Sequence, residues 1–380
     1  MQGEAFTYSD VLIKPRYSEI ESRSKVSLRT DIGNAVLKLP VISSNMKTIT
    51  GPKMAATMAQ HKAMGILHRF CTVEENVEMF NEAVAILYKD GWPPRLSPEE
   101  LLAKWRPVLD DVITDVKRPF PEIVESKPIT LVHNIGVSVG VKDVDKERFD
   151  KLYEAGARIF CIDVAHGHHI HVKNMLNWIN ARLEPSLRQI ITVIAGNIAT
   201  PEAYQDLATW GADVVKVGIG PSPVCRTRFN TGVGVPQLYA LESIYQESLT
   251  YNDAPYIIAD GGISCVGDIA KALKYSDAVM LGSMIAGTAE TPGDVFRNEH
   301  GDLYKVYGGS ASGENKGENR YVEGVIKTVK FDGKVKYILR EIEQGLQSAF
   351  SYVGVDNHSD YQFNCELVPI SIGSHKESRI

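Results

Sequence analysis

The sequence predicts a (β/α)8 barrel, formed by a single catalytic domain over residues 1–380. Eight short apolar runs recur along the chain, and the segments between several of them have helical character. The runs are continuous rather than alternating, as expected for parallel strands that are buried on both faces. Polar or glycine-rich residues follow each run. Eight strand–helix repeats favour the barrel, and an open doubly wound sheet is the alternative.

The predicted strands fall at nearly regular spacing. In chain order they are LPVISS (39–44), GILHRF (65–70), ITLVHNIGV (129–137), RIFCIDV (158–164), IITVIAG (190–196), DVVKVGI (213–219), YIIADGG (256–262) and DAVMLGS (277–283). The segments 142–157 and 200–212 read as amphipathic helices. Thr200, Pro201 and Glu202 form a helix-start signal for the second of them.

Three regions depart from the simple repeat. Residues 86–127, after the second strand, read as a helical insert with proline-rich edges that is too short for a domain of its own. Residues 308–324 are polar and glycine-rich, which is the composition of a mobile active-site flap. Residues 355–380 form a C-terminal tail without a strong pattern.

Composition restricts the class of partner. Hydrophobic residues make up 44% and charged residues 23%, and the net charge is -6, so there is no basic excess for nucleic-acid binding. No apolar run has the length of a membrane span, and MQGEAFTYSD lacks the features of a signal peptide. The five cysteines are scattered without paired spacing, which predicts a reducing, cytoplasmic setting.

The strand ends carry the candidate chemistry, because barrels place their active sites at the carboxyl ends of the strands. Cys225 lies there, in the glycine- and proline-rich loop after the sixth strand. Arg226 and Arg228 flank it and can lower its pKa. By contrast, Cys161 lies inside an apolar run and is expected to be buried. The glycines after the seventh and eighth strands suit phosphate binding through backbone amides.

These motifs resemble the family of IMP dehydrogenases and GMP reductases. The loop GIGPSPVCRTR (218–228), followed by GVGVPQ (232–237), looks like the family's catalytic loop, GIGPGSxCTTR and GVGxPQ. Residues 6–24, 43–46, 267–273 and the flap also match. The resemblance implies a homotetrameric barrel that binds a purine nucleoside 5′-monophosphate and a nicotinamide dinucleotide.

Within the family, the sequence is more similar to the reductases. The 86–127 insert stands where the dehydrogenases usually carry regulatory domains, and Arg320-Tyr321 lies only one residue before Glu323-Gly324. The resemblance therefore implies NADPH-dependent reduction of GMP to IMP and ammonia through a covalent cysteine thioimidate. Three alternatives stay open: an IMP dehydrogenase without the regulatory domains, an enzyme for a deoxy or modified purine, and a nucleotide-binding relative without turnover.

The resemblance also implies roles for individual residues. Cys225 matches the nucleophile, and Thr227 and Glu323 match the acid–base pair. The substrate positions are Asp260, Gly261, Gly262, Gly282, Ser283, Gly308, Gly309, Ser310 and Gly324. The cofactor positions are Ser22, Arg23, Arg69, Asp163, Val164, Ala165, Ile219 and Gly220.

Many family members hold a monovalent cation such as K⁺ on carbonyls of the cysteine loop. The matching positions here are Gly220, Ser222, Cys225 and Arg228. The chain departs from the family at Ser222, Pro223 and Arg226, which puts this cation site in question. Lys47 stands where the family usually has aspartate, which suggests an altered purine substrate. The histidines at 166, 168, 169 and 171 lack the pattern of a metal site.

Overall fold

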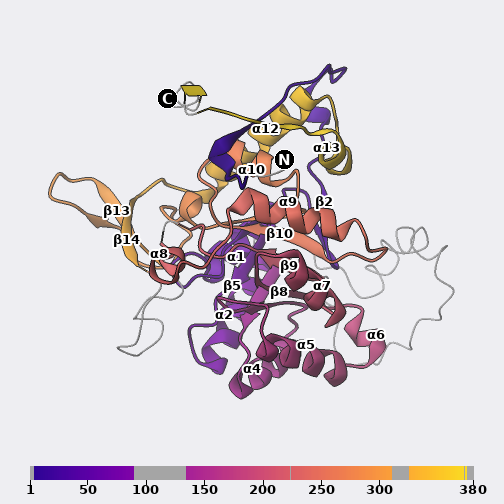
Figure 1. Cartoon of the computed structure of the whole chain (residues 1–380). Coiled ribbons are helices and arrows are strands. Elements are labelled where there is room, and N and C mark those ends of the chain that lie inside the picture. Colours follow the sequence, from indigo (N-terminus) through magenta and orange to yellow (C-terminus); the bar gives the residue numbers. More distant parts are fainter. Residues whose placement is uncertain (1–3, 90–133, 223, 310–324, 372, 375–380) are drawn as a thin grey trace, which may run out of the picture.

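The computed structural model describes residues 4–89, 134–222, 224–309, 325–371 and 373–374. Its centre is a closed barrel of eight parallel strands that neighbour one another in chain order (Figure 1). The strands are β4 (Val41–Ser43), β5 (Met64–Leu67), β6 (Ile135–Val139), β7 (Ile159–Asp163), β8 (Thr192–Ile198), β9 (Val214–Val217), β10 (Tyr256–Asp260) and β11 (Ala278–Leu281). The predicted barrel is confirmed.

Every predicted strand run overlaps one barrel strand, and the end of the third run overlaps β6. The run was expected at 129–137, whereas β6 spans Ile135–Val139 and residues 129–133 lie outside the described residues. The strand continues past the apolar run because Ser138, which is buried, accepts a 2.8 Å hydrogen bond from Asn45 Nδ2. A partnered hydroxyl is tolerated inside a barrel, so polarity alone did not mark the strand end.

Helices surround the barrel. They are α1 (Pro52–Gln60), α2 (Val73–Lys89), α4 (Asp143–Glu154), α5 (Ile170–Arg182), α6 (Pro185–Arg188), α7 (Pro201–Thr209), α8 (Thr227–Thr231), α9 (Gln237–Ser248), α10 (Val266–Ala272), α12 (Val335–Val353) and α13 (His358–Asn364). Thr200 Oγ1 accepts the N–H of Ala203 at 3.3 Å, so α7 starts as predicted. Of the predicted insert, residues 86–89 continue α2, and the rest lies outside the described residues.

Smaller sheets and single 3₁₀ turns complete the described fold. The 3₁₀ turns are η1 (Tyr8–Asp10), η2 (Arg23–Lys25) and η3 (Ser283–Ile285); the strands are β1 (Val11–Ile13) with β15 (Leu367–Pro369), β2 (Thr30–Ile32) with β3 (Ala35–Leu37), and β12 (Phe296–Arg297), β13 (Leu303–Gly308) and β14 (Ile326–Lys330). The antiparallel pair of β1 and β15 ties the C-terminal tail to the start of the chain. The β13–β14 hairpin extends away from the barrel (Figure 1).

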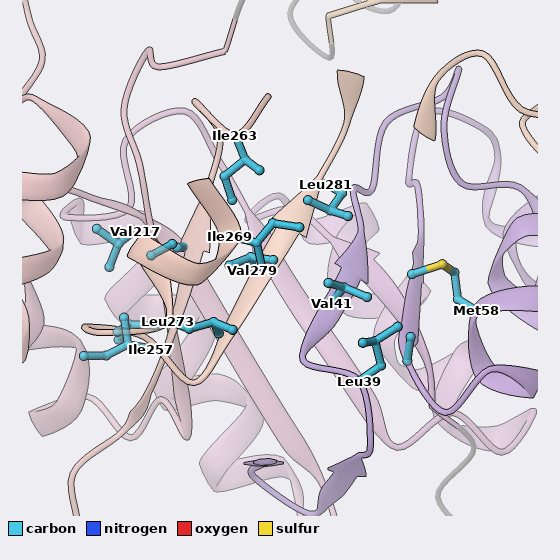
Figure 2. Close-up of a cluster of buried hydrophobic side chains, with 14 of the residues drawn as sticks. Leu39, Val41, Met58, Val217, Ile257, Ile263, Ile269, Leu273, Val279 and Leu281 are labelled. Atoms are coloured by element: carbon cyan, nitrogen blue, oxygen red, sulfur yellow. The ribbon is translucent and has the colours of Figure 1, made fainter. Parts of the chain in front are cut away.

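The core has two layers. Inside the barrel, alternate strand residues such as Ile66, Cys161 and Ile258 pack together, and the β2–β3 hairpin adds Ile32 and Leu37. The remaining strand faces pack against helices, as Figure 2 shows for strands β4, β9, β10 and β11. Burial of apolar surface on both faces is the main stabilising contribution to such a barrel. Cys161 is buried as predicted, and burial raises the pKa of its thiol to about 12.

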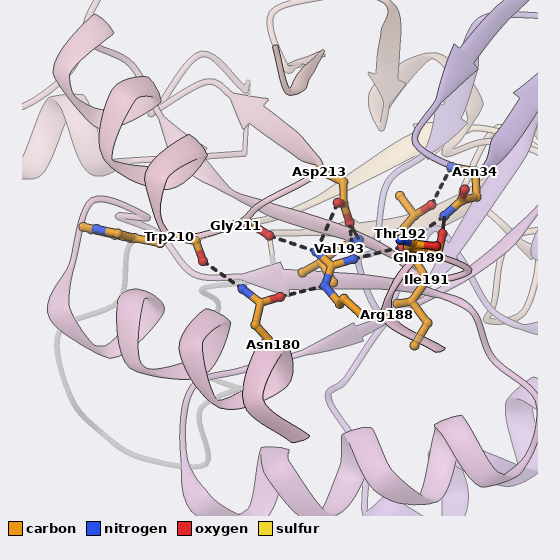
Figure 3. A network of polar contacts seen from close by, with 10 residues as sticks. All are labelled: Asn34, Asn180, Arg188, Gln189, Ile191, Thr192, Val193, Trp210, Gly211 and Asp213. Atoms are coloured by element: carbon orange, nitrogen blue, oxygen red, sulfur yellow. Dashed lines mark hydrogen bonds and ion pairs between the residues drawn. The ribbon is translucent and has the colours of Figure 1, made fainter. Parts of the chain in front are cut away.

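A polar network closes the amino-terminal rim of the barrel (Figure 3). Arg188 donates to Asn180 Oδ1 at 2.6 Å and to the carbonyl of Gly211 at 2.9 Å, and it pairs with Asp213 at 3.0 Å. Asp213 in turn accepts the N–H of Val193 at 2.7 Å. The network therefore joins the starts of β8 and β9 to α5 and α6.

In the described ranges, no helix combines the length and the apolar character that a membrane crossing requires. The five cysteines are all free.

Candidate active site

Polar side chains gather at the carboxyl ends of the barrel strands. Asn45 and His68 follow β4 and β5, Asp163 ends β7, Asn197 lies near the end of β8, and Asp260 ends β10. Parallel strands bring their carboxyl ends to one edge, so these groups share one mouth. The mouth is the site that the sequence predicts.

Lys216 lies below this mouth and joins two of its carboxylates. Its side chain projects from β9 and is only 2% exposed. The ammonium donates to Asp163 Oδ1 at 2.9 Å, to Asp260 Oδ2 at 2.8 Å and to Asn197 Oδ1. Asn197 Nδ2 also donates to Asp260 Oδ2 at 2.8 Å. The network therefore fixes both carboxylates relative to each other.

The charges of this network stabilise one another. Burial alone would raise the pKa of Asp163, but the charge and hydrogen bond of Lys216, helped by Arg69, hold that pKa below its usual range. Burial would likewise lower the pKa of Lys216, but Asp163 and Asp260 raise it well above the usual range for lysine. Both groups are therefore charged at neutral pH, and the ammonium partly neutralises the two carboxylates.

Arg69 and Asp163, which are both predicted cofactor positions, lie next to each other. One guanidinium nitrogen donates to the carbonyl of Asp163 at 3.2 Å. The Nε atom is buried and has no partner among the described residues. The next predicted position, Val164, donates its N–H to the carbonyl of Gly196 at 3.1 Å, which holds the β7 loop against β8. The predicted positions 163–165 thus lie on one loop next to Arg69.

Cys225 and Thr227 lie side by side on the loop after β9. The Cys225 Sγ and Thr227 Oγ1 atoms are 3.2 Å apart, within hydrogen-bond distance, and both side chains are partly exposed. The N–H of Cys225 donates to the carbonyl of Ser222 at 3.0 Å, so the loop turns tightly before the thiol. The loop therefore holds these two catalytic candidates within contact distance of each other.

The cysteine loop packs closely on the loop after β10. Gly218 has a φ of +149°, and a Cβ there would lie 2.0 Å from the carbonyl oxygen of Asp260. A Cβ at Gly261, whose φ is +91°, would lie 2.8 Å from Pro221. Gln237 donates to the carbonyl of Val217 at 2.8 Å and supports the same contact. These glycines are required because no side chain fits between the loops.

The predicted phosphate positions Gly282 and Ser283 follow β11, and Ser283 begins the 3₁₀ turn η3. A Cβ at Gly282 would lie 2.9 Å from the hydroxyl of Tyr307. Tyr307 is buried, and its phenol bonds the side chain of Ser222. Burial raises the pKa of Tyr307, so its hydroxyl is protonated at neutral pH. Tyr307 therefore connects the cysteine loop to the end of β11.

Gly308 and Gly309 have other backbone partners in this structure. The N–H of Gly308 donates to Thr48 Oγ1 at 3.1 Å, and that of Gly309 donates to the carbonyl of Val325 at 3.1 Å. Phosphate binding by these amides would require an exchange of partners. The predicted residues Ser310, Glu323 and Gly324 lie outside the described residues.

Ser22 and Arg23 are not brought to Asp163 by any contact within the described part of the chain. Arg23 donates to Ser348 Oγ at 2.9 Å and lies over the ring of Tyr352 at 5.4 Å, both on α12. Ser22 precedes η2 and bonds Ser24 Oγ at 2.8 Å. Arg23 thus contacts α12, and Ser22 contacts its neighbour Ser24, rather than the loop of Asp163.

The predicted cation positions lie together, with an arginine among them. Arg228 Nε donates to the carbonyl of Ile219 at 3.0 Å, and its NH2 group donates to the carbonyl of Val235. A Cβ at Gly220, whose φ is +78°, would lie 2.6 Å from Arg228 Cγ. The guanidinium thus already supplies a positive charge to carbonyls of this loop. The carbonyl of Ser222 accepts the N–H of Cys225.

The histidine cluster has structural partners. His168 Nε2 pairs with Asp206 Oδ2 at 2.7 Å, and His169 Nδ1 accepts the N–H of His171 at the start of α5. In the described ranges, no three His, Cys, Asp or Glu side chains are placed to hold a metal ion.

Sequence reasoning missed three residues of the site: Lys216, Asn197 and Tyr307. A charged residue inside the apolar run DVVKVGI was the available signal for Lys216, because an interior lysine needs a buried partner. Asn197 comes directly after the fifth apolar run, and a polar side chain at that strand end was the available signal for it. Tyr307 had no signal in the sequence, because its contacts come from segments that are distant in the chain.

Known proteins are similar to this chain over most of its length. The model for the IMP dehydrogenase / GMP reductase domain matches residues 5–380. A GMP reductase of Leptothrix cholodnii is 37% identical and covers 94% of both chains. An inosine-5′-monophosphate dehydrogenase of Borreliella burgdorferi is 34% identical over 99% of this chain and 96% of its own. A crystal structure of GMP reductase from Trypanosoma brucei in complex with guanosine 5′-monophosphate matches with a TM-score of 0.81 at 28% identity, covering 100% of this chain and 98% of the other.

Proposed function

The chain belongs to the IMP dehydrogenase / GMP reductase family, and we propose that it is a GMP reductase that converts GMP to IMP and ammonia with NADPH. The observation that carries the proposal is the Cys225–Thr227 pair, 3.2 Å apart, on a loop packed against Asp260. The similarity to GMP reductases over more than nine-tenths of the chain supports the same branch.

Cys225 acts as the nucleophile. Its thiolate forms a bond to C2 of the purine, and the C2–N2 bond then breaks to give a thioimidate. The leaving amine needs a proton. Thr227, which lies next to the thiol, donates this proton, and Glu323 is its partner in the acid–base pair. After C2 has accepted a hydride, the bond between C2 and sulfur breaks, which releases IMP and returns the thiolate.

Asp260 binds the ribose in this proposal. Its Oδ2 atom accepts from Lys216 and Asn197, and the side chain is 20% exposed, so the carboxylate can also reach a ligand. A carboxylate that is fixed on one oxygen can accept ribose hydroxyls on the other. Backbone amides at Gly261, Gly262 and Gly282 suit the phosphate.

The cofactor is NADPH, which supplies the hydride to C2 when it is bound. The residues near Asp163 fit a polar nicotinamide group, because Arg69 Nε is buried there without a partner in the described residues and the Asp163 side chain is 15% exposed. Because Arg23 contacts α12, a cofactor role for it fits an assembly in which the N-terminal segment of one chain meets the site of another. We also propose a homotetramer and a cytoplasmic setting.

Lys47 is a reason to test other purines. It is exposed directly after the β4 end, where the family usually has aspartate. Burial, then the charges of Lys47 and Arg148, lower the pKa of His68 to about 4, so His68 is neutral next to this lysine. A substrate screen should therefore include deoxyguanosine 5′-monophosphate and base-modified GMP.

The test is turnover by the purified chain. GMP with NADPH should give IMP and ammonia as NADPH absorbance falls. IMP with NAD giving XMP and NADH would instead identify the dehydrogenase, the second candidate, which the Borreliella relative supports. Cys225→Ala should abolish reduction and retain GMP binding, whereas Cys265→Ala, at an exposed cysteine, should leave turnover unchanged. Full turnover by Cys225→Ala would refute the mechanism.

A further inference from the structure

A hollow of about 400 Å³ lies at the rim of the barrel opposite the mouth. Leu39 and Lys62, which line it, immediately precede strands β4 and β5, so they mark the amino-terminal ends of those strands. The other wall is the first half of α12, from Lys336 to Glu343. The hollow is therefore separate from the proposed active site.

The lining of this hollow is strongly basic. Cations reach it from three segments: Lys38 before β4, Lys62 after α1, and Lys336 and Arg340 on α12; His61 also lines it. Glu343 is the one carboxylate among its lining residues. The whole chain has a net charge of -6, so this concentration of positive charge is local rather than a consequence of composition.

The positive groups interact unfavourably with one another. The pKa of Lys62 is lowered below the usual range by its hydrogen bond to Lys38 and by the charge of that lysine. Burial, then the charge of Lys336, lowers the pKa of His61. Within the part of the chain that the structure describes, neither Lys336 nor Arg340 forms an ion pair. The charge of Glu343 acts in the opposite direction on the pKa values of His61 and Lys62 and offsets part of this repulsion, and a bound anion would relieve more of it.

The start of α12 contributes basic side chains to the same place. This helix has 19 residues, and its first turn contains no acidic side chain. Lys334 is its N-cap residue and Lys336 follows in the first turn, although helix starts normally favour acidic residues. Glu290 Oε2 accepts the N–H of Val335 at 2.8 Å, so a carboxylate already occupies the helix start, and the attraction for anions comes from the basic side chains of the hollow.

We propose that this hollow is a second ligand site, which binds a phosphate-bearing anion with at least two negative charges. Its volume accommodates a chain of phosphates rather than one small ion. Two sources share this chemistry: an inorganic polyphosphate and the phosphate chain of a nucleotide. Tyr337, which is 62% exposed at the edge of the hollow, can stack a nucleotide base.

Titration calorimetry of the full chain, with sodium tripolyphosphate and with ATP, tests the site. Both titrations are repeated with saturating GMP, which occupies the proposed active site. Binding should persist with GMP present and weaken as salt concentration rises. Tighter binding of ATP than of tripolyphosphate would identify the nucleotide as the ligand, and equal or weaker binding of ATP would identify the phosphate chain alone. Either result supports the anion site.

The double variant Lys38→Glu/Arg340→Glu should weaken binding at least about tenfold. Lys146→Glu/Lys151→Glu makes the same charge change on α4, on exposed residues outside the hollow, and should bind as the wild type does. An unchanged melting temperature and unchanged turnover show that each variant is folded. The proposal is overturned if neither anion binds, if GMP abolishes binding, or if the Lys38→Glu/Arg340→Glu chain binds like the wild type. None of these results depends on which purine the enzyme reduces.

Discussion

Lys216 Nζ and Asp260 Oδ2 lie 2.8 Å apart inside the barrel, with the ammonium also 2.9 Å from Asp163 Oδ1. Lys216 therefore connects the carboxylate on the substrate side of the proposed site to the one on the cofactor side. A shift of about 1 Å in a positioning group can reduce the rate a hundredfold, so this network bears directly on catalysis.

Replacing Lys216 by Met should reduce both stability and kcat. Two carboxylates would be left near each other without their cation, which costs about 3 kcal/mol of unfolding free energy. We expect kcat to fall at least about a hundredfold. Urea unfolding and GMP turnover measure the two effects.

The double variant Lys216→Met/Asp163→Asn is the control for this prediction. Because it removes one of the uncompensated charges, it should be more stable than Lys216→Met alone. If the two substitutions instead destabilise the protein additively, the ion pair is not the source of the effect.

Gly218→Ala should disrupt the site with a smaller effect on the rest of the fold. The new Cβ would lie 2.0 Å from the carbonyl of Asp260, at a φ of +149°, so the cysteine loop must move. We expect kcat with GMP and NADPH to fall about a hundredfold. Gly267→Ala in α10, where the nearest atom would be 3.7 Å away, should leave kcat unchanged. Equal activities of the two variants would contradict the packing argument.

Arg188→Ala should lower stability without changing catalysis. It removes the partner of Asp213 and the bonds to Asn180 and Gly211 at the amino-terminal rim (Figure 3). A loss of about 2–3 kcal/mol follows from an unpaired, partly buried carboxylate. Because the network lies opposite the mouth, KM and kcat should stay constant at temperatures where the variant is folded.

The control for Arg188→Ala is Arg182→Ala, which removes an ion pair with Asp150 that is more exposed than the one between Arg188 and Asp213. It should cost less than about 1 kcal/mol. If the melting temperature of Arg182→Ala is as low as that of Arg188→Ala, the rim network contributes no more to stability than an exposed ion pair does.

His358 should make the protein less stable in acid. Burial is the main cause of its pKa of about 4, compared with about 6.5 in the unfolded chain, so the unfolded state binds more protons between these values. Stability is therefore complete above about pH 6.5 and is lost as the pH falls toward 4. From pH 7.5 to pH 5 this group should contribute a loss of about 2 kcal/mol.

Urea unfolding at the two pH values measures this loss. His358→Gln keeps a donor for the carbonyl of Leu273, 3.3 Å from His358 Nε2, and should show a smaller pH dependence than the wild type. His300→Gln, at an exposed histidine, should keep the pH dependence of the wild type. If His358→Gln retains the full loss, another group is responsible.

The sequence by itself determined the barrel and its reactive loop. Continuous apolar runs must be buried on both faces, so the eight strands could be located, although β6 extends past its run to Val139 and includes the partnered Ser138. Cys225 and Thr227 are two residues apart, and local chain geometry is enough to bring them together.

The tertiary structure alone decided which distant residues meet. Lys216, Asp163 and Asp260 come from three strands, and closure of the barrel brings their charges into one buried network. Tyr307 meets Gly282 because the β13–β14 hairpin returns to the barrel mouth, and Arg23 meets α12 rather than Asp163. Such contacts depend on how strands and helices pack in space, and a linear pattern of residue types does not contain that information.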